Sequence, residues 1–308
     1  MQHDVIVIGG SFAGLSAALY LARARLSVCI IDAGKPRNRF ADQSHGFFSQ
    51  DGSSPLDMIA TARAQVGAYP TVTFVQGVAA DARKEGAGIS VTLANGDVHT
   101  SSKLLLAFGI SDILPEIAGL AERWGKSVIH CPYCHGYEFS GQKLGVLQLS
   151  PLSGHQAMLI ANWGPTTFYL NGAAPLDEAI LAQFKQRSIG VEAANIEALT
   201  GDGPHLSRVE LVGGRSQEID ALYIGPSQRL NSPVAEQLGC AIAISPFGPF
   251  IQVDEVKMTS VADVYAAGDI TRGGGHTVTF ACSDGVMAAL AIHRAMVSEG
   301  LKIGTAAA

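Results

Sequence analysis

The segment near the amino terminus constrains the fold more than any other part of the chain. Residues 5–8 form a short β-branched run that is typical of a buried parallel strand. A glycine-rich turn follows at residues 9–14, residues 15–22 are predicted to be helical, and residues 27–32 form a second apolar strand. Strand, turn, helix and strand together make a βαβ unit, which requires a mostly parallel sheet. The predicted fold class is therefore α/β.

The turn inside this unit predicts a dinucleotide site. At such a site a tight turn brings helix-start N–H groups onto a pyrophosphate, and an acid about 20 residues further on binds a ribose. Gly9 and Gly14 supply the turn and the close helix–strand contact, and Asp32 has the position of the ribose acid. Ser11 replaces the middle glycine, and its N–H can still donate to phosphate. An ordinary glycine-containing turn is the alternative, which the strand–turn–helix context disfavours.

Length and composition favour two domains and exclude several classes of protein. The chain has 308 residues, 47% hydrophobic and 16% charged, which excludes disorder. A net charge of -6 without a dense Lys/Arg run argues against nucleic acid or an anionic membrane as partner. We find no signal peptide and no apolar run of membrane-spanning length, so we expect a cytoplasmic protein. A second βαβ-like unit begins near residue 143 and indicates a coarse duplication. Further strands are predicted at residues 72–75, 89–93, 103–108 and 261–267, and further helices at residues 154–163 and 284–297.

The sequence HCPYCHGYE at residues 130–138 places Cys131 and Cys134 in a CxxC motif between His130 and His135. A structural zinc site needs four ligands, usually in two spaced pairs, and the sequence contains no second CxxC. A redox disulfide is favoured over zinc and over an inert pair, because a CxxC that opens a helix places a thiol on N–H groups that lower its pKa. Either histidine could act on that thiol as a proton carrier, or could simply bond to the backbone.

Cys29, Cys240 and Cys282 are single cysteines, and we expect them to be buried structural thiols.

These motifs resemble those of a known family over nearly the whole chain. The run at residues 264–269, which ends in Gly268-Asp269, resembles the turn by which two-dinucleotide flavoproteins hold the flavin ribitol and phosphate, so the first site is interpreted as an FAD site. Together with GGSFAG, SHGFFSQDG (residues 44–52), CPYCHGYE and GDITRGGGHTVTFACSDG (residues 268–285), it resembles low-molecular-weight thioredoxin reductases. The divergent branch that includes gliotoxin-type dithiol oxidases is the most similar.

The resemblance implies two three-layer Rossmann-like domains, the second inserted into the first. The FAD-binding domain would comprise residues 1–114 and 246–308, and residues 115–245 would form the inserted domain with the CxxC. Cys134 would face the flavin and Cys131 would exchange with substrate sulfur. The family's aspartate after the second cysteine is His135 here, so His135 and His130 are the two candidates for the acid–base residue. The implied FAD-binding residues are Gly9, Ser11, Ala13, Gly14, Asp32, His45, Gly46, Asp51, Gly109, Gly268, Asp269, His276, Thr277 and Val278.

The second nucleotide site is the largest departure from the family pattern. Thioredoxin reductases have a glycine-rich turn there, and this chain has Gln-Leu-Ser-Pro-Leu-Ser at residues 148–153. The basic run that grips the extra phosphate of NADPH is replaced by Asn171-Gly172-Ala173. Gln148 and Leu149 are too bulky for a close pyrophosphate, and Pro151 lacks an N–H. We therefore expect the fold to be kept while NADPH binding is doubtful.

The resulting functional hypothesis is flavin-mediated thiol–disulfide exchange through Cys131 and Cys134. In the first version a dithiol reduces the disulfide, and FAD passes the electrons to oxygen or another acceptor without NADPH. The second version is an NADPH-dependent thioredoxin reductase with an unusual nucleotide site, and the third is a redox-sensing flavoprotein without turnover. The expected partners are a small dithiol or disulfide, or a thioredoxin-like protein, and the family resemblance implies a homodimer.

Overall fold

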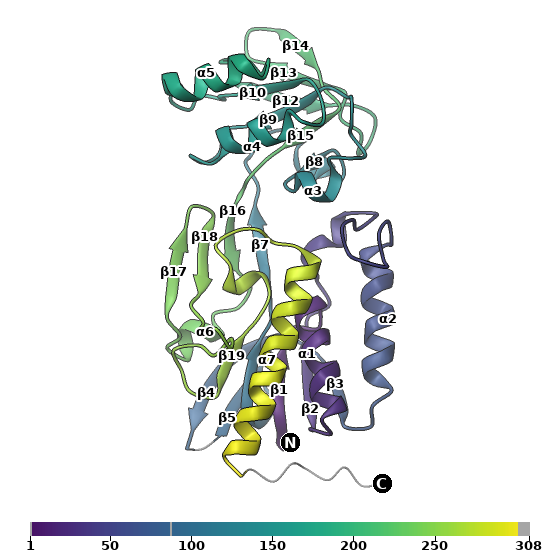
Figure 1. Ribbon diagram of the computed structural model, residues 1–308, viewed down its shortest axis with the longest axis vertical. Coiled ribbons are helices and arrows are strands. Elements are labelled where there is room, and N and C mark those ends of the chain that lie inside the picture. Colours follow the sequence, from purple (N-terminus) through teal and green to yellow (C-terminus); the bar gives the residue numbers. More distant parts are fainter. Residues whose placement is uncertain (1, 87, 301–308) are drawn as a thin grey trace. The chain divides into compact units, whose positions relative to one another are not determined.

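The computed structural model describes residues 2–86 and 88–300, which divide into two compact units (Figure 1). Unit 1 comprises Met1–Arg39, Leu56–Ser111 and Gln228–Ala308, and unit 2 comprises Phe40–Pro55 and Asp112–Ser227. The return to unit 1 thus comes earlier than the predicted boundary at residue 245. The reason is that Val234, Ala235 and Cys240 are buried in the same apolar cluster as the unit 1 sheet.

Unit 1 is built on a seven-stranded sheet with the order β3-β2-β1-β6-β5-β4, and β19 also pairs with β6. The strands β1, β2, β3, β6 and β19 are parallel, as predicted, and β4 and β5 extend the sheet in antiparallel fashion. The elements are β1 (Gln2–Ile8), α1 (Phe12–Arg23), β2 (Val28–Asp32), η1 (Arg37–Phe40), α2 (Pro55–Gly67), β3 (Val72–Gln76), β4 (Ala79–Glu85), β5 (Gly88–Leu93), β6 (Val98–Leu106), β7 (Ile110–Ile113), β16 (Ser227–Leu230), α6 (Val234–Gln237), β17 (Ile242–Ser245), β18 (Gly248–Ile251), β19 (Val264–Ala266), η3 (Asp269–Thr271) and α7 (Val278–Ser298).

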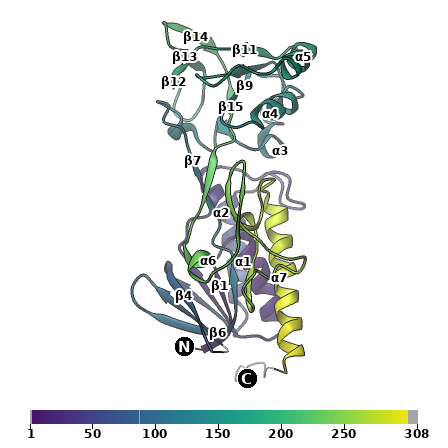
Figure 2. The ribbon, with the colours of Figure 1, turned by 90° about the vertical axis from the view of Figure 1, so that its left-hand side faces the viewer.

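One face of this sheet is covered by α1 and α7, which lie side by side (Figures 1 and 2). Their contact is close, because a Cβ atom at Gly285 of α7 would come within 2.1 Å of the Ala13 carbonyl oxygen of α1. By length and composition α7 could cross a membrane, but its small and apolar residues Ala288, Ala289 and Ile292 are buried in the core of unit 1. The helix begins before the predicted residue 284, because the Thr277 side chain accepts a hydrogen bond from the Phe280 N–H and caps it.

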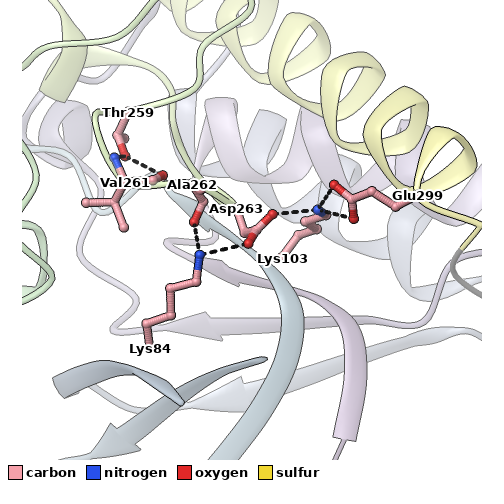
Figure 3. A network of polar contacts seen from close by, with 7 residues as sticks. All are labelled: Lys84, Lys103, Thr259, Val261, Ala262, Asp263 and Glu299. Atoms are coloured by element: carbon pink, nitrogen blue, oxygen red, sulfur yellow. Dashed lines mark hydrogen bonds and ion pairs between the residues drawn. The ribbon is translucent and has the colours of Figure 1, made fainter. Parts of the chain in front are cut away.

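A buried cation, the Lys103 ammonium, joins two of the three chain segments of unit 1 (Figure 3). The Lys103 side chain on β6 is only 2% exposed, and its Nζ donates to Asp263 and Glu299, each at 2.6 Å. Lys84 on β4 donates to Asp263 as well, at 2.9 Å. Burial lowers the pKa of Lys103, but the bonds to both carboxylates outweigh burial and raise it overall. Lys103 is therefore charged in the folded protein, and it fixes the end of α7 to the sheet.

Unit 2 is a three-layer structure around a five-stranded parallel sheet with the order β11-β10-β9-β15-β8. Helices α4 and α5 contribute to the apolar cluster on one face, and the antiparallel sheet β12-β13-β14 contributes to the cluster on the other (Figure 2). The elements are η2 (Ala121–Arg123), β8 (Val128–Ile129), α3 (Pro132–His135), β9 (Leu144–Leu147), α4 (Ser153–Ile160), β10 (Thr166–Tyr169), α5 (Glu178–Gln186), β11 (Gly190–Glu192), β12 (Ile196–Thr200), β13 (Arg208–Leu211), β14 (Arg215–Glu218) and β15 (Ala221–Tyr223). Strand β9 and helix α4 confirm the second βαβ-like unit near residue 143, so the duplication predicted from the sequence is real.

Candidate functional site

The turn between β1 and α1 requires glycine at several positions, because a side chain there would collide with the backbone or with Asp32. Gly9 has φ +113°, and a Cβ atom there would come within 2.2 Å of the Ala107 carbonyl oxygen. A Cβ atom at Gly14 would come within 1.8 Å of the Gly9 carbonyl oxygen, so this glycine sets the contact between helix and strand. Ser11 is the N-cap residue of α1, but its side chain does not cap the helix. The first turn of α1 contains no acidic residue, and its N–H groups favour an anionic ligand.

Asp32 ends β2 beside this turn. Its Oδ1 accepts a hydrogen bond from the Gly10 N–H at 3.1 Å, and its Oδ2 lies 3.4 Å from Arg63 Nη1. A Cβ atom at Gly10 would come within 2.7 Å of the Asp32 carboxyl carbon. The acid is thus held against the glycine turn with its carboxylate oriented by a backbone N–H, as a ribose-binding acid needs to be.

The carboxy-terminal segment closes the same region of unit 1. Gly268 has φ +81°, and a Cβ atom there would come within 2.9 Å of the Ala13 Cβ, so both residues belong to one closely packed surface. Asp269 accepts a hydrogen bond from Arg37 Nη1 at 3.0 Å. The structure therefore brings together five of the predicted FAD residues at the first turn, Gly9, Ser11, Ala13, Gly14 and Asp32, with Gly268 and Asp269.

The ion pairs that Asp284 makes with Arg272 and Lys257 next to this segment were not predicted from the sequence. Asp284, at 1% exposure of the whole residue, accepts two hydrogen bonds from Arg272 at 3.0 and 2.8 Å, and it lies 2.7 Å from Lys257 Nζ. A buried acid is stable only when it is paired, so Asp284 fixes the loop after η3 onto α7. Sequence could have revealed it, since Asp284 is the sole acid within the otherwise uncharged first part of α7.

The other predicted flavin residues of unit 1 lie at element boundaries. His276, Thr277 and Val278 form the start of α7, and His276 Nε2 lies 3.3 Å from the Arg272 carbonyl oxygen. Gly109 has φ +70° and its carbonyl accepts from the Asn231 N–H at 3.2 Å, just before β7. Their contact with a flavin stays a prediction.

The residues at this turn fit an FAD molecule. The glycine cradle has no room for side chains, the N–H groups of the α1 turn face it without a side-chain cap, and Asp32 stands at the ribose position. Gly9, Ser11 and Gly14 would hold the pyrophosphate, Asp32 a ribose, and Gly268-Asp269 the ribitol and phosphate. Bound FAD would supply a two-electron acceptor.

The CxxC motif forms a disulfide in unit 2. Cys131 and Cys134 are joined, with their Cα atoms 5.3 Å apart. Cys131 is the N-cap of α3, and its Sγ accepts a hydrogen bond from the Cys134 N–H at 3.1 Å. A thiolate released at Cys131 would therefore face a backbone N–H, which favours the charged form. Cys131 is 8% exposed and Cys134 is half-buried, so Cys134 is the more exposed residue of the pair within this unit.

His135 belongs to a cluster that joins the CxxC to the loop at residues 44–53. Its ring meets the His45 ring edge-on, with centroids 6.2 Å apart. His45 Nδ1 lies 3.5 Å from Asp51, and its Nε2 lies 3.4 Å from Glu138. Burial lowers the pKa of His135; Glu138 raises it and His45 lowers it, with a net lowering. His135 is consequently neutral at pH 7 and able to accept a proton from an adjacent thiol.

His45, Gly46 and Asp51, which the resemblance placed at the flavin, are thus grouped with the CxxC in unit 2. The Gly46 N–H donates to Asp51 Oδ1 at 2.8 Å, and an antiparallel bridge between Ser44 and Ser53 closes the loop. The contact of His45 with Glu138 was not predicted, because nothing in the two sequence motifs indicates that they meet.

His130 has a different environment from His135. Its ring packs against the Trp124 ring at a centroid distance of 5.9 Å, and its carbonyl oxygen accepts a hydrogen bond from Gln156 Nε2 at 3.0 Å. These contacts fix the entry to α3. The acid–base role of either histidine stays a prediction.

Three exposed aromatic residues belong to the segments of this cluster. Tyr133 is 72% exposed, Tyr137 is 83% exposed, and Phe48 is 94% exposed. Tyr133 lies inside the CxxC itself and meets the Trp163 ring edge-on at 6.0 Å. Large aromatic side chains at such exposure are typical of a surface that receives a ligand.

The second turn, at residues 148–153, has its N–H groups satisfied from within. The Leu149 and Ser150 N–H groups both donate to the Ser153 Oγ at 3.1 Å, and the Leu152 N–H donates to the Ser150 Oγ at 3.2 Å. The buried Gln148 Oε1 has no hydrogen-bond partner among the described residues. Asn171, at the position of the basic run, accepts from the Ile196 N–H at 2.8 Å.

Comparisons with known proteins identify the family of this chain. Residues 3–147 match the family model described as pyridine nucleotide-disulphide oxidoreductase. A thioredoxin reductase of Claviceps purpurea (tcpT) is 32% identical over 86% of this chain and 86% of its own length. A thioredoxin reductase of Leptosphaeria maculans (sirT) is 30% identical over the same shares.

Solved structures show the same architecture. An oxidoreductase from Agrobacterium tumefaciens is 44% identical, with a TM-score of 0.92 over 97% of this chain and 99% of its own. The predicted fold of two Rossmann-like domains and the predicted family are therefore confirmed, and the family implies FAD as cofactor. The chain belongs to the same family as these thioredoxin reductases and is a thioredoxin reductase-like flavoenzyme.

Proposed function

We propose that this enzyme oxidises a small dithiol through the Cys131–Cys134 disulfide and does so without NADPH. The observation that carries the proposal is the turn at residues 148–153, whose N–H groups already donate to Ser150 and Ser153. A pyrophosphate would have to displace these bonds, and Asn171 offers no positive charge in return. In contrast, the groups needed for thiol–disulfide exchange are present, namely the Cys131–Cys134 disulfide and the neighbouring His45–His135 pair.

The exchange follows from the geometry of the CxxC. One substrate thiolate attacks a sulfur of the disulfide, and the substrate's second thiolate then displaces the protein sulfur from the mixed disulfide. The substrate leaves as a disulfide, and Cys131 and Cys134 become thiols. FAD, when bound, would supply the acceptor for the two electrons of this dithiol, and oxygen or another oxidant would be the final acceptor.

His135 takes the proton of the exchanging thiols. It adjoins Cys134, and its lowered pKa keeps the imidazole neutral at pH 7. His45 acts as a positioning residue, because its ring lies edge-on to His135 while Asp51 and Glu138 hold both of its nitrogens. This assignment favours His135 over His130.

The exposed side chains of Phe48, Tyr133 and Tyr137 support a small substrate with an apolar or aromatic body. Aromatic rings would bind such a body while the disulfide exchanges with its sulfurs. The three alanine variants should raise KM for an aromatic dithiol more than for dithiothreitol. Equal effects on both substrates would remove the support for an aromatic substrate.

Stopped-flow reduction of the flavin is the test of this function. NADPH at saturation should bleach the flavin slowly or not at all, whereas dithiothreitol should bleach it and air should restore it. Cys131→Ser and Cys134→Ser should each abolish reduction by dithiol. Cys240→Ser is the matched control, because that buried thiol bonds to Thr259 and lies outside the site.

An NADPH-dependent thioredoxin reductase is the second candidate, favoured by the names of the relatives in Claviceps and Leptosphaeria. Fast, saturable bleaching at micromolar NADPH would establish it and overturn the first proposal. A protein that neither reagent reduces would instead be a redox sensor without turnover.

A further inference from the structure

Three side chains from adjacent strands of unit 1 meet at a place that thiol–disulfide exchange does not use. They are His3 of β1, Cys29 of β2 and His99 of β6, and one ligand atom of each lies within 4.8 Å of the others. Cys29 Sγ is 3.9 Å from His99 Nδ1, and the rings of His3 and His99 stack with centroids 5.8 Å apart. We call them the His3–Cys29–His99 cluster.

The sheet order explains why these residues meet. Strand β1 lies between β2 and β6, with Ile6 opposite Cys29 and His3 opposite Ser101. The cluster lies at the amino end of the parallel strands, whereas the Gly9 turn follows their carboxyl end. Gly9 follows His3 by six residue steps of extended chain, a distance of about 20 Å. The cluster is therefore a separate place from the nucleotide turn.

The cluster contains a buried polar atom without a hydrogen-bond partner. His3 Nε2 is buried and bonds to nothing in the described part of the chain. Such an atom costs about 1–3 kcal/mol unless something satisfies it. Cys29 is fully buried and His99 is buried, so a bound group is better able than bulk solvent to provide the missing partner.

A cation would compete with protons at this cluster. Burial lowers the pKa of His3, and His99 lowers it further, so the imidazole is neutral near pH 7. Burial raises the pKa of the Cys29 thiol to about 11, so a bound cation would have to displace the thiol proton.

We propose that His3, Cys29 and His99 form a binding site for a borderline-soft divalent cation, Zn²⁺ in the first place. Two imidazoles and one thiolate are ligands that zinc prefers, and water would complete a tetrahedral set. Zn–N and Zn–S bonds of about 2.0–2.3 Å place ligand atoms roughly 3.5 Å apart. Cys29 and His99 are already close to this separation at 3.9 Å, and the His3 ligand atom, which lies within 4.8 Å of both, would have to move closer to them.

Its role is structural. The site joins the first strand of the chain to both of its neighbours, and it lies away from the nucleotide turn. A catalytic Cys29–His99 pair is excluded as an interpretation, because the fully buried sulfur is out of reach of a substrate and its thiol pKa is raised. Zinc binding should therefore stabilise the protein without changing its flavin.

The test uses the oxidised, FAD-loaded full chain without an affinity tag and without reductant. In that state Cys131 and Cys134 form the disulfide and offer no thiolate. Co²⁺ serves as the probe, because its tetrahedral absorption bands lie at longer wavelengths than oxidised flavin. One equivalent of Co²⁺ per chain should produce these bands, and one equivalent of Zn²⁺ should remove them.

Variants locate the cation. His3→Gln, His99→Gln and Cys29→Ser should each lower Co²⁺ affinity at least tenfold, while their FAD content and reduction by dithiothreitol stay unchanged. Cys240→Ser is the control, since it removes a buried thiol elsewhere in unit 1 and should bind Co²⁺ as the parent does. His3 is partly exposed, so His3→Gln keeps the test valid if a variant at a buried position fails to fold.

Thermal unfolding gives an independent readout. Zn²⁺ at about 100-fold excess over its Kd should raise the Tm of the parent by roughly 5 °C and leave that of His3→Gln unchanged. Absence of stoichiometric binding would overturn the proposal, as would binding that persists in all three variants of the cluster. Neither result would bear on dithiol oxidation, which is measured separately through the flavin.

Discussion

The two strand–turn–helix segments, β1 to α1 in unit 1 and β9 to α4 in unit 2, have the same order of elements but use serine in opposite ways. In the first, the Ser11 side chain leaves the N–H groups at the start of α1 uncapped. In the second, Ser150 and Ser153 accept hydrogen bonds from the N–H groups of the turn. The duplicated fold has thus kept its architecture in both units, while the hydroxyls of the second turn accept the hydrogen bonds that, in our proposal, would otherwise go to a phosphate. A fold repeat alone therefore does not establish a repeated ligand site.

The largest expected difference between the two turns is their tolerance of a methyl group. Gly14→Ala should abolish FAD retention and destabilise unit 1 by at least about 3 kcal/mol, because the new Cβ would lie 1.8 Å from the Gly9 oxygen. The matched change Gly154→Ala in α4 should be tolerated, since its Cβ would lie 3.4 Å from Ile180. FAD content and thermal unfolding of both variants measure the contrast. Equal losses in the two would show that the turns do not differ as described.

Dithiol-dependent reduction of the flavin should depend on His135 of unit 2, although the N–H groups of that unit's turn already have hydrogen-bond acceptors. His135→Gln should slow dithiol-dependent flavin reduction roughly 100-fold, the usual contribution of a positioned base. In the parent, the rate should fall as pH drops through the lowered pKa of His135, because only the neutral imidazole accepts the thiol proton. The measurement is the rate against pH, and the variant should lose this inflection. His130→Gln is the control and should keep it.

Asp32 provides a smaller contrast at the first turn. Asp32→Ala should weaken FAD binding by about 2 kcal/mol, roughly 30-fold, through loss of one charged hydrogen bond. Equilibrium dialysis of FAD measures the effect. Asp97→Ala, in the exposed hairpin before β6, should leave FAD affinity unchanged. If both variants retain FAD equally well, Asp32 does not bind the ribose.

The smallest effect is expected from opening the second turn. Ser153→Ala should destabilise the protein by about 1–2 kcal/mol, because the Leu149 and Ser150 N–H groups lose their shared acceptor. NADPH should still fail to bleach the flavin, since Asn171 cannot pair the extra phosphate. Urea unfolding and stopped-flow absorbance measure the two outcomes. Rapid bleaching in this variant would show that the serine alone closes the site.

Sequence predicted most of the fold because its signals were local. The run before Gly9, the turn itself and Asp32 each indicate their own element, and the CxxC indicates its chemistry by spacing. Contacts between distant segments could not be predicted in this way. His45 meets Glu138 across about ninety residues, and the paired acid Asp284 is supported by Lys257 and Arg272 from other loops.

The predicted boundary at residue 245 failed for a similar reason. The residues around α6 are short apolar stretches without periodicity, and only their packing onto the sheet of unit 1 shows where they belong. The hydroxyl caps of the second turn are likewise visible only in three dimensions. The sequence showed which groups were missing there, namely glycines and arginines, but not what had replaced them.

The pairing of β19 with β6 has a consequence for biosynthesis. Residues 104–106 of β6 pair with residues 264–266, and Lys103 pairs with Asp263 and Glu299. All of these partners leave the ribosome after the whole of unit 2, most of which is one continuous segment, Asp112–Ser227. Unit 2 can therefore fold during translation. During that time residues 104–106 of β6 lack their partner strand β19, so this edge of the strand is unpaired. Nascent chains stalled before residue 264 should thus depend most strongly on chaperones, and release of α7 should end that dependence.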